Sequence, residues 1–138
     1  MTRVKGTSRQ SLIARIRKVC LSFPETSERP SHGSPAFFIR GKRAFVMYMN
    51  NHHGDGRLAL WCAAQREIQQ MLVSASPRHY FVPPYVGHLG WIGVRLDRRL
   101  SWGKITAAIE DAYLTVAPKK LIGVVRRARC LIQPAKHT

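Results

Sequence analysis

Acidic residues are scarce in this sequence. Seven Asp and Glu stand against 23 Lys and Arg, which gives a formal net charge of +16. A fold with so much like charge repels itself, whereas contact with a polyanion turns that charge into attraction by displacing counterions. Nucleic acid is therefore the first candidate partner, with a basic surface that serves only solubility as the alternative.

The chain is also poor in cysteine and has no long apolar run. Cys20, Cys62 and Cys130 are odd in number and widely spaced, so we expect reduced, buried thiols rather than a disulfide framework or a zinc knuckle. The longest apolar run, residues 58–64, is too short to span a bilayer, and the start of the chain leads into no apolar signal segment. We expect one cytoplasmic domain over residues 1–138, with 1–7 and 130–138 as flexible tails.

Hydrophobic periodicity predicts an α+β fold. An amphipathic helix is expected from Ser8 to Pro24, followed by a loop or short irregular strand over 24–35. Later elements are a hairpin (36–40 and 43–50) turning at Gly41-Lys42, a strand (57–62), a helix (64–75), strands (80–86 and 91–96), a helix capped by Ser101 and ended by Pro118, and a helix (119–129). Hairpins without βαβ crossovers favour an antiparallel sheet of about five strands with helices packed on it.

Candidate contacts to phosphate groups follow from where the basic side chains lie in this pattern. The tip of the first hairpin carries Arg40, Lys42 and Arg43, which are the leading candidates, and Arg57 and Arg78 are lesser ones. From Pro118 onward the chain has no acidic residue, which predicts a second contact made by Lys119, Lys120, Arg126 and Arg127.

A different class of function, a protein-interaction or small-ligand module, is the alternative. Tyr85 and His88 lie beside paired prolines and a glycine-rich turn, where side chains are expected to be exposed. Binding grooves are mostly apolar with a few convergent polar groups. The residues of such a groove would be His52, His53, Tyr85, His88 and Trp91.

Catalytic and metal-binding signals are weak. No nucleophile has a recognisable base and orienting carboxylate, and no two carboxylates form a hydrolytic pair, so we expect neither catalytic residues nor an enzyme. A glycine-rich turn accounts for His52, His53 and Asp55 better than a metal site does, because their spacing matches no metal motif. Further ligands would have to come from His32, His79 or His88, and we expect no metal and no cofactor.

Seven ordered segments between about residues 13 and 121 form a recognisable pattern. They are Phe23-Pro24-Glu25, His32-Gly33-Ser34-Pro35-Ala36-Phe37, Gly41-Lys42, Asn51-His52-His53-Gly54-Asp55-Gly56-Arg57, Phe81-Val82-Pro83-Pro84-Tyr85-Val86-Gly87-His88, Gly90-Trp91-Ile92-Gly93-Val94-Arg95-Leu96-Asp97 and Ala112-Tyr113-Leu114-Thr115-Val116-Ala117-Pro118-Lys119. In these segments the chain resembles the MmcQ/YjbR-like family. The resemblance implies an α+β fold similar to the double-wing DNA-binding module of the phage MotA activator, and a DNA-binding function by analogy of fold. The sequence departs from the family where Trp102-Gly103-Lys104 opens a helix that tends to begin with acidic residues.

Overall fold

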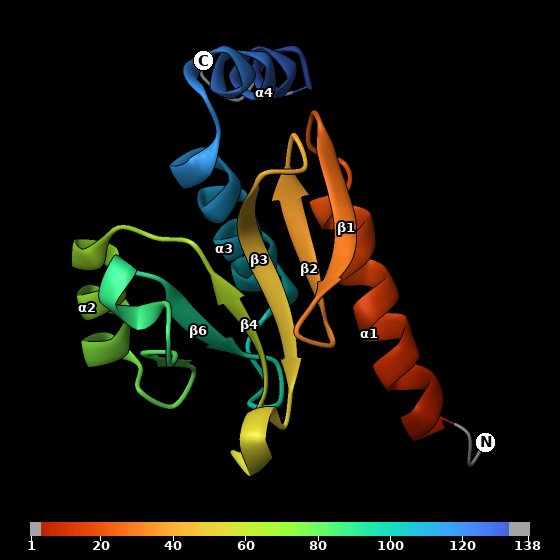
Figure 1. Ribbon diagram of the computed structural model, residues 1–138, viewed down its shortest axis with the longest axis vertical. Helices are drawn as coiled ribbons and strands as arrows, with labels where there is room; N and C mark the ends of the chain where they lie inside the picture. Colours follow the sequence, from red (N-terminus) through yellow and green to blue (C-terminus); the bar gives the residue numbers. More distant parts are fainter. Residues whose placement is uncertain (1–3, 133–138) are drawn as a thin grey trace.

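A computed structural model describes residues 4–132 of the chain, with side chains described for residues 12–131. Its helices and strands alternate along the chain much as the hydrophobic pattern predicts (Figure 1). In order they are α1 (Val4–Cys20), β1 (Thr26–Ser31), β2 (Ser34–Ile39), β3 (Arg43–Asn50), the 3₁₀ turn η1 (His52–Gly54), β4 (Leu58–Cys62), α2 (Arg66–Ala75), β5 (Tyr80–Phe81), the 3₁₀ turn η2 (Gly87–Leu89), β6 (Ile92–Arg95), α3 (Trp102–Val116) and α4 (Lys119–Ile132).

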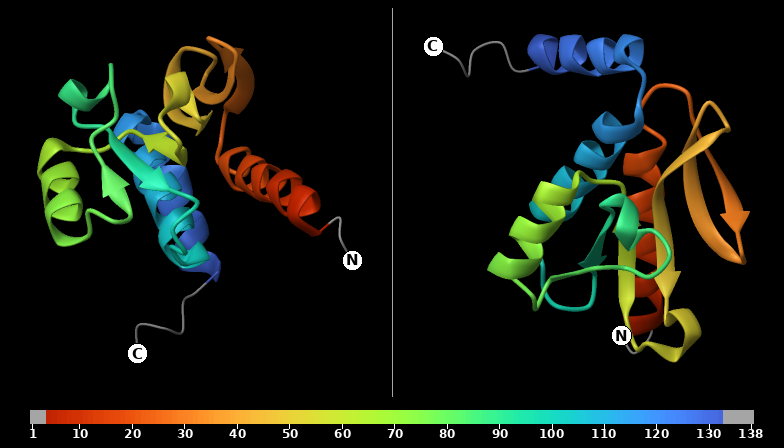
Figure 2. Two further views of the ribbon diagram at one scale, coloured as in Figure 1. Left: turned by 90° about the horizontal axis from the view of Figure 1, so that it is seen from below. Right: turned by 60° about the vertical axis from the view of Figure 1, so that its left-hand side comes forward.

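The strands form one antiparallel sheet in the order β1-β2-β3-β4-β6-β5. The predicted α+β class is confirmed, with six strands in place of about five. Helices α1 and α3 pack on the same side of the sheet (Figure 2). The core between them buries Ile16 of α1, Ile109 and Tyr113 of α3, and Leu60 and Val94 of the strands. Successive side chains of a strand point to opposite faces of the sheet, so Leu60 of β4 and Val94 of β6 lie on the face that packs against the helices.

The segment predicted as a loop or irregular strand is a regular edge strand. Strand β1 pairs with β2 along its whole length, from Thr26 opposite Ile39 to Ser31 opposite Ser34. Pro30 fits there because the outer side of an edge strand needs no N–H donor. Glu28, half-buried, accepts a 2.9 Å hydrogen bond from Arg17 Nη2 of α1, so β1 is fixed to the first helix as well as to the sheet.

The predicted strand over 80–86 is wrong beyond Phe81. Two prolines, Pro83 and Pro84, remove the backbone donors that a strand would need, and Tyr85 takes a positive φ of 66°. The chain instead forms a loop over residues 82–91. The buried side chain of Gln69 in α2 holds this loop by donating to the carbonyl oxygens of Gly87 (2.9 Å) and Trp91 (2.6 Å).

The hairpin between β2 and β3 turns one residue earlier than predicted. Arg40 (φ 55°) and Gly41 (φ 66°) are the central pair, and the N–H of Lys42 donates to the carbonyl oxygen of Ile39 at 3.0 Å. Two consecutive positive φ values are those of a type I′ hairpin turn. Glu25 supports the unusual conformation of Arg40 by accepting a 2.8 Å hydrogen bond from its Nε.

The helix ends confirm part of the prediction and extend it. Ser101 caps α3 by accepting from the N–H of Lys104, and α3 ends just before Pro118, as predicted. The helix α1 begins at Val4 rather than Ser8, and α4 continues to Ile132, so residues 4–7 and 130–132 of the predicted tails are helical. The rest of those tails lies outside the described residues.

None of the helices in residues 4–132 combines the length and apolar character needed to cross a bilayer.

The cysteines differ in exposure, which gives a testable expectation. Cys20 and Cys62 are fully buried, and burial raises the pKa of both thiols, whereas Cys130 is exposed near the end of α4. The prediction of buried thiols is therefore correct for two and wrong for Cys130. Because the thiolate is the reactive form, we expect one thiol to react with Ellman's reagent at pH 8 in the native protein and three after unfolding in guanidinium chloride. Fast reaction of a second thiol in the native protein would contradict the burial of Cys20 and Cys62.

Candidate nucleic-acid interface

The two predicted basic segments meet in space. A hollow of about 490 Å³ is lined on one side by Arg40, Lys42 and Arg43 of the hairpin tip and on the other by residues 115–119, which include Lys119. We call this site the basic hollow. The hairpin tip and α4 lie at the same end of the molecule (Figure 1).

Packing of α3 against β3 explains why these segments meet. The rings of Phe45 on β3 and Tyr113 on α3 are in edge contact at 5.5 Å. Tyr113 also donates a 2.8 Å hydrogen bond from its hydroxyl to the carbonyl oxygen of Pro24. The helix α3 therefore ends beside the hairpin tip. Pro118 then breaks the helix, and its carbonyl oxygen accepts from the N–H groups of Leu121 and Ile122 in the first turn of α4.

The start of α4 concentrates positive charge. The helix dipole places partial positive charge at this end, and the first turn contains no acidic residue but carries Lys119 and Lys120. Cations at a helix N-terminus are unfavourable by themselves, and a bound anion removes the conflict. The arrangement therefore suits an anionic ligand.

Most cations of the basic hollow have no acidic partner. Arg40 forms an ion pair with Glu25, and both side chains are about half exposed (45% and 49%). Lys42, Arg43 and Lys119 are exposed and take part in no ion pair within residues 12–131. The hollow thus keeps most of its charge for an external partner.

Arg57 and Arg78, the lesser predicted contacts, lie away from the basic hollow. Arg57 comes just before Leu58, the first residue of β4, which pairs with Asn50 at the end of β3. The hairpin tip lies at the opposite end of β3, just before its first residue, Arg43. Its guanidinium lies 4.1 Å above the ring of Phe81. Arg78 lies beside the same end of the sheet, because the carbonyl oxygen of the following residue, His79, accepts from the N–H of Arg95.

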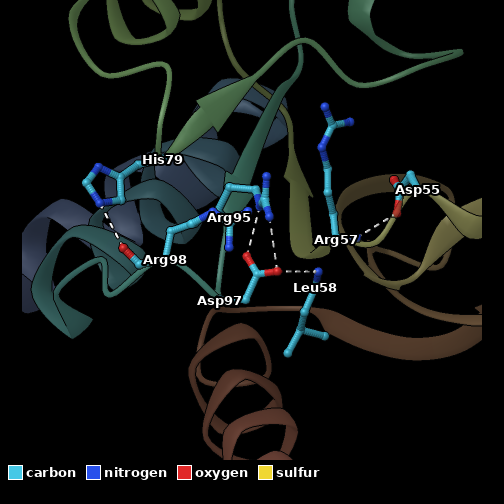
Figure 3. Close-up of polar contacts among 7 residues, drawn as sticks. All are labelled: Asp55, Arg57, Leu58, His79, Arg95, Asp97 and Arg98. Carbon is cyan, nitrogen blue, oxygen red and sulfur yellow. Dashed lines mark hydrogen bonds and ion pairs between the residues drawn. The ribbon is translucent and has the colours of Figure 1, made fainter.

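Other charges at that end of the sheet are engaged in local contacts (Figure 3). Asp97 accepts from Arg95 Nε (2.8 Å) and Nη2 (3.2 Å), and also from the N–H of Leu58 (3.2 Å). Burial acts to raise the pKa of Asp97, but these hydrogen bonds and the charge of Arg95 lower it on balance. His79 Nε2 lies 2.9 Å from the carbonyl oxygen of Arg98, to which it can donate. The arginine of this network, Arg95, therefore has a structural role in holding β4 and β6 together.

The remaining predicted contacts lie along α4. Arg126 lines a hollow of about 330 Å³ together with Asp111 of α3. A Cβ added to Gly123 would lie 3.3 Å from Nη1 of Arg127. The guanidinium of Arg127 therefore extends back along α4 toward Gly123. Arg129 forms an ion pair with Glu110 of α3. The side of α4 that faces α3 is thus partly neutralised.

The residues of the alternative groove divide into two groups. His52, His53 and Tyr85 come together, with the ring of His52 4.1 Å from that of His53 and 5.7 Å from that of Tyr85. Trp91 instead packs against the core, and His88 is exposed while its carbonyl oxygen accepts from Arg66. Among the described residues, no three His, Cys, Asp or Glu side chains are placed to share a metal ion.

One residue of this region was not among those predicted for the groove. Trp61 of β4 contacts the ring of His52 at 4.9 Å. A tryptophan within the apolar run 58–62 has no local signal that separates it from an ordinary core residue. Its contact with His52 depends on how the turn after β3 folds back over the sheet.

Comparisons with known proteins agree with this fold. The sequence profile of the YjbR family matches residues 21–115, more than half of the chain. A search of the curated proteins finds no match. The crystal structure of protein DR2400 from Deinococcus radiodurans, whose domain is described as DUF419, is similar with a TM-score of 0.65 at 18% sequence identity, over 78% of this chain and 80% of that one. The profile match covers most of the domain, and the chain belongs to the YjbR family.

Proposed function

We propose that this protein is a non-enzymatic nucleic-acid-binding domain, with DNA as the expected partner, and that it holds the phosphate backbone in the basic hollow. The observation that carries the proposal is the meeting of the hairpin tip with the start of α4, where Lys42, Arg43 and Lys119 have no acidic partner among residues 12–131. Cations from two separate elements can contact successive phosphates along a strand.

The rest of the molecule supports this choice of partner. A net charge of +16 attracts a polyanion over long range and speeds its encounter with the protein. The positive end of the α4 helix dipole, at Lys119 and Lys120, adds attraction for phosphate oxygens. Both features act on phosphate and neither reads a base, so the proposed contact is independent of sequence.

The salt dependence of binding tests the proposal. Arg40, Lys42, Arg43, Lys119 and Lys120 together offer up to five phosphate contacts. Each neutralised phosphate on duplex DNA contributes about −0.9 to the slope of log affinity against log salt, so three to five contacts give an expected slope of roughly −2.7 to −4.5. Gel-shift or anisotropy titrations at several salt concentrations measure it.

These titrations and a heparin experiment separate the proposal from the alternative, a protein-interaction or small-ligand module. A slope near zero, or no binding in dilute buffer, would rule out electrostatic docking. A groove-binding module would be retained on heparin by its charge alone, and excess oligonucleotide would leave its ligand in place.

A further inference from the structure

Two buried polar atoms, in rings that contact each other, have no hydrogen-bond partner among the described residues. Trp61 is only 3% exposed, and its Nε1 has no partner among the described residues. The same holds for Nε2 of His52, whose ring is in edge contact with that of Trp61 at 4.9 Å and 74°. Buried polar groups are satisfied in most proteins, so two unsatisfied atoms in contacting rings require an explanation.

The backbone around this pair is strained. Asn51 (φ 56°), His53 (φ 47°) and Tyr85 (φ 66°) all lie in the left-handed region, which side chains other than glycine rarely adopt. The turn is nevertheless held firmly. Asn51 donates from its N–H to the carbonyl oxygen of Arg57 (2.7 Å) and accepts at Oδ1 from the N–H of Gly56 (2.8 Å). Strain that the surroundings impose in this way is concentrated at ligand sites.

Exposed aromatic surface adjoins the unpaired atoms. Tyr85 is 67% exposed, and its ring contacts His52 edge-on at 5.7 Å. It comes from the loop over residues 82–91, far along the chain from the turn that carries His52 and His53. We call His52, His53, Trp61 and Tyr85 the aromatic cluster. Exposed rings of this kind are surfaces on which bases stack.

The chemistry of the two unpaired atoms is complementary to a cyclic amide. Trp61 Nε1 can only donate, and His52 Nε2 can accept when the imidazole carries its hydrogen on Nδ1. A neighbouring C=O and N–H in one planar ring satisfies both, and thymine, uracil and guanine present that edge. We propose that the aromatic cluster binds the amide edge of an unpaired nucleobase, with Tyr85 turning aside to admit the base and then stacking on it.

This inference extends the proposed function, because it supplies base contacts to a domain whose basic hollow contacts only phosphates. Strand β3 has eight residues and spans roughly 26 Å, with the hairpin tip at one end and the turn containing His52 at the other. A single strand of several nucleotides is long enough to reach both sites. A free nucleoside tests the aromatic cluster without requiring the basic hollow.

The first test observes the Trp61 indole N–H directly. In ¹H–¹⁵N spectra, the three indole signals are assigned with the variants Trp61→Phe, Trp91→Phe and Trp102→Phe. Thymidine at tens of millimolar should shift the Trp61 signal in a saturable manner and leave that of Trp102 unchanged. The matched control ligand, N3-methylthymidine, lacks the N–H that His52 would accept and should cause a much smaller shift. A Trp61 signal that thymidine does not move, or that both ligands move equally, overturns the proposal.

The second test uses single strands with the same number of phosphates. We expect a twelve-nucleotide oligothymidylate to bind about tenfold more tightly than an abasic strand of equal length. His52→Phe, which keeps an aromatic ring, and Trp61→Phe should remove this preference without changing abasic binding or its salt slope, and Trp102→Phe should leave it intact. Equal affinity of the wild-type protein for both strands refutes base binding while phosphate binding stands. If neither strand binds, the basic hollow fails as a nucleic-acid site and the thymidine titration alone decides the aromatic cluster.

Discussion

Reversing the charge of Lys42 and Lys119 together should weaken binding to duplex DNA on the order of 100-fold at physiological salt and make the salt slope shallower by about 2. Each reversal removes one phosphate contact, worth about 0.9 in the slope, and replaces attraction with repulsion. Both side chains are exposed and form no ion pair within the described part of the chain, so the double variant Lys42→Glu/Lys119→Glu should fold as the wild type does. Anisotropy titrations at three or more salt concentrations give both quantities.

A matched control separates a local contact from the effect of total charge. Arg99→Glu/Lys104→Glu changes the net charge by the same amount, at exposed positions before and within the first turn of α3. We expect this variant to lose only a few-fold in affinity and to keep the wild-type slope, because long-range steering depends on total charge whereas the slope counts contacts. Equal losses in the two double variants would show that the basic hollow is not the binding site.

The elements that the sequence predicted correctly are those whose signals are local. Helix α3 has its own cap at Ser101 and its own stop at Pro118, and both are read from adjacent residues. The sequence predicts only a loop or short irregular strand where the regular strand β1 lies, because the residues of β1, Thr-Ser-Glu-Arg-Pro-Ser, have little strand propensity. It forms because β2 offers a complete row of partners and Arg17 of α1 anchors Glu28.

The candidate site also shows that sequence patterns predict local features better than contacts between distant segments. Composition and turn signals placed cations at the hairpin tip and after Pro118, and both groups are exposed in the structure. No local pattern could show that the two groups face each other, since this depends on α3 packing along β3. Trp61 and His52 are a further case, because the burial of two unsatisfied nitrogen atoms in contacting rings is a property of three-dimensional packing alone.

The loop that carries Tyr85 depends on a glycine that no other residue can replace without distortion. Gly90 has a φ of 99°, and a Cβ added there would lie 2.8 Å from the carbonyl oxygen of Ala64 and 2.9 Å from the backbone nitrogen of Arg66. Backbone atoms at the start of α2 cannot move aside as a flexible side chain would. The loop and the helix therefore approach each other more closely than a side chain at position 90 permits.

Gly90→Ala should for these reasons lower the free energy of unfolding by roughly 3 kcal/mol, combining the left-handed penalty of about 1–2 kcal/mol with the displacement of the loop from α2. For a domain of this size the melting temperature would fall by roughly 10 °C. The control is Gly103→Ala, where an added Cβ in α3 has no neighbour within 4 Å and alanine favours the helix, so the melting temperature should stay unchanged or rise by a few degrees. Thermal unfolding followed by circular dichroism compares the two, and a Gly90→Ala protein as stable as the Gly103→Ala protein would mean that the loop does not pack against α2 as described.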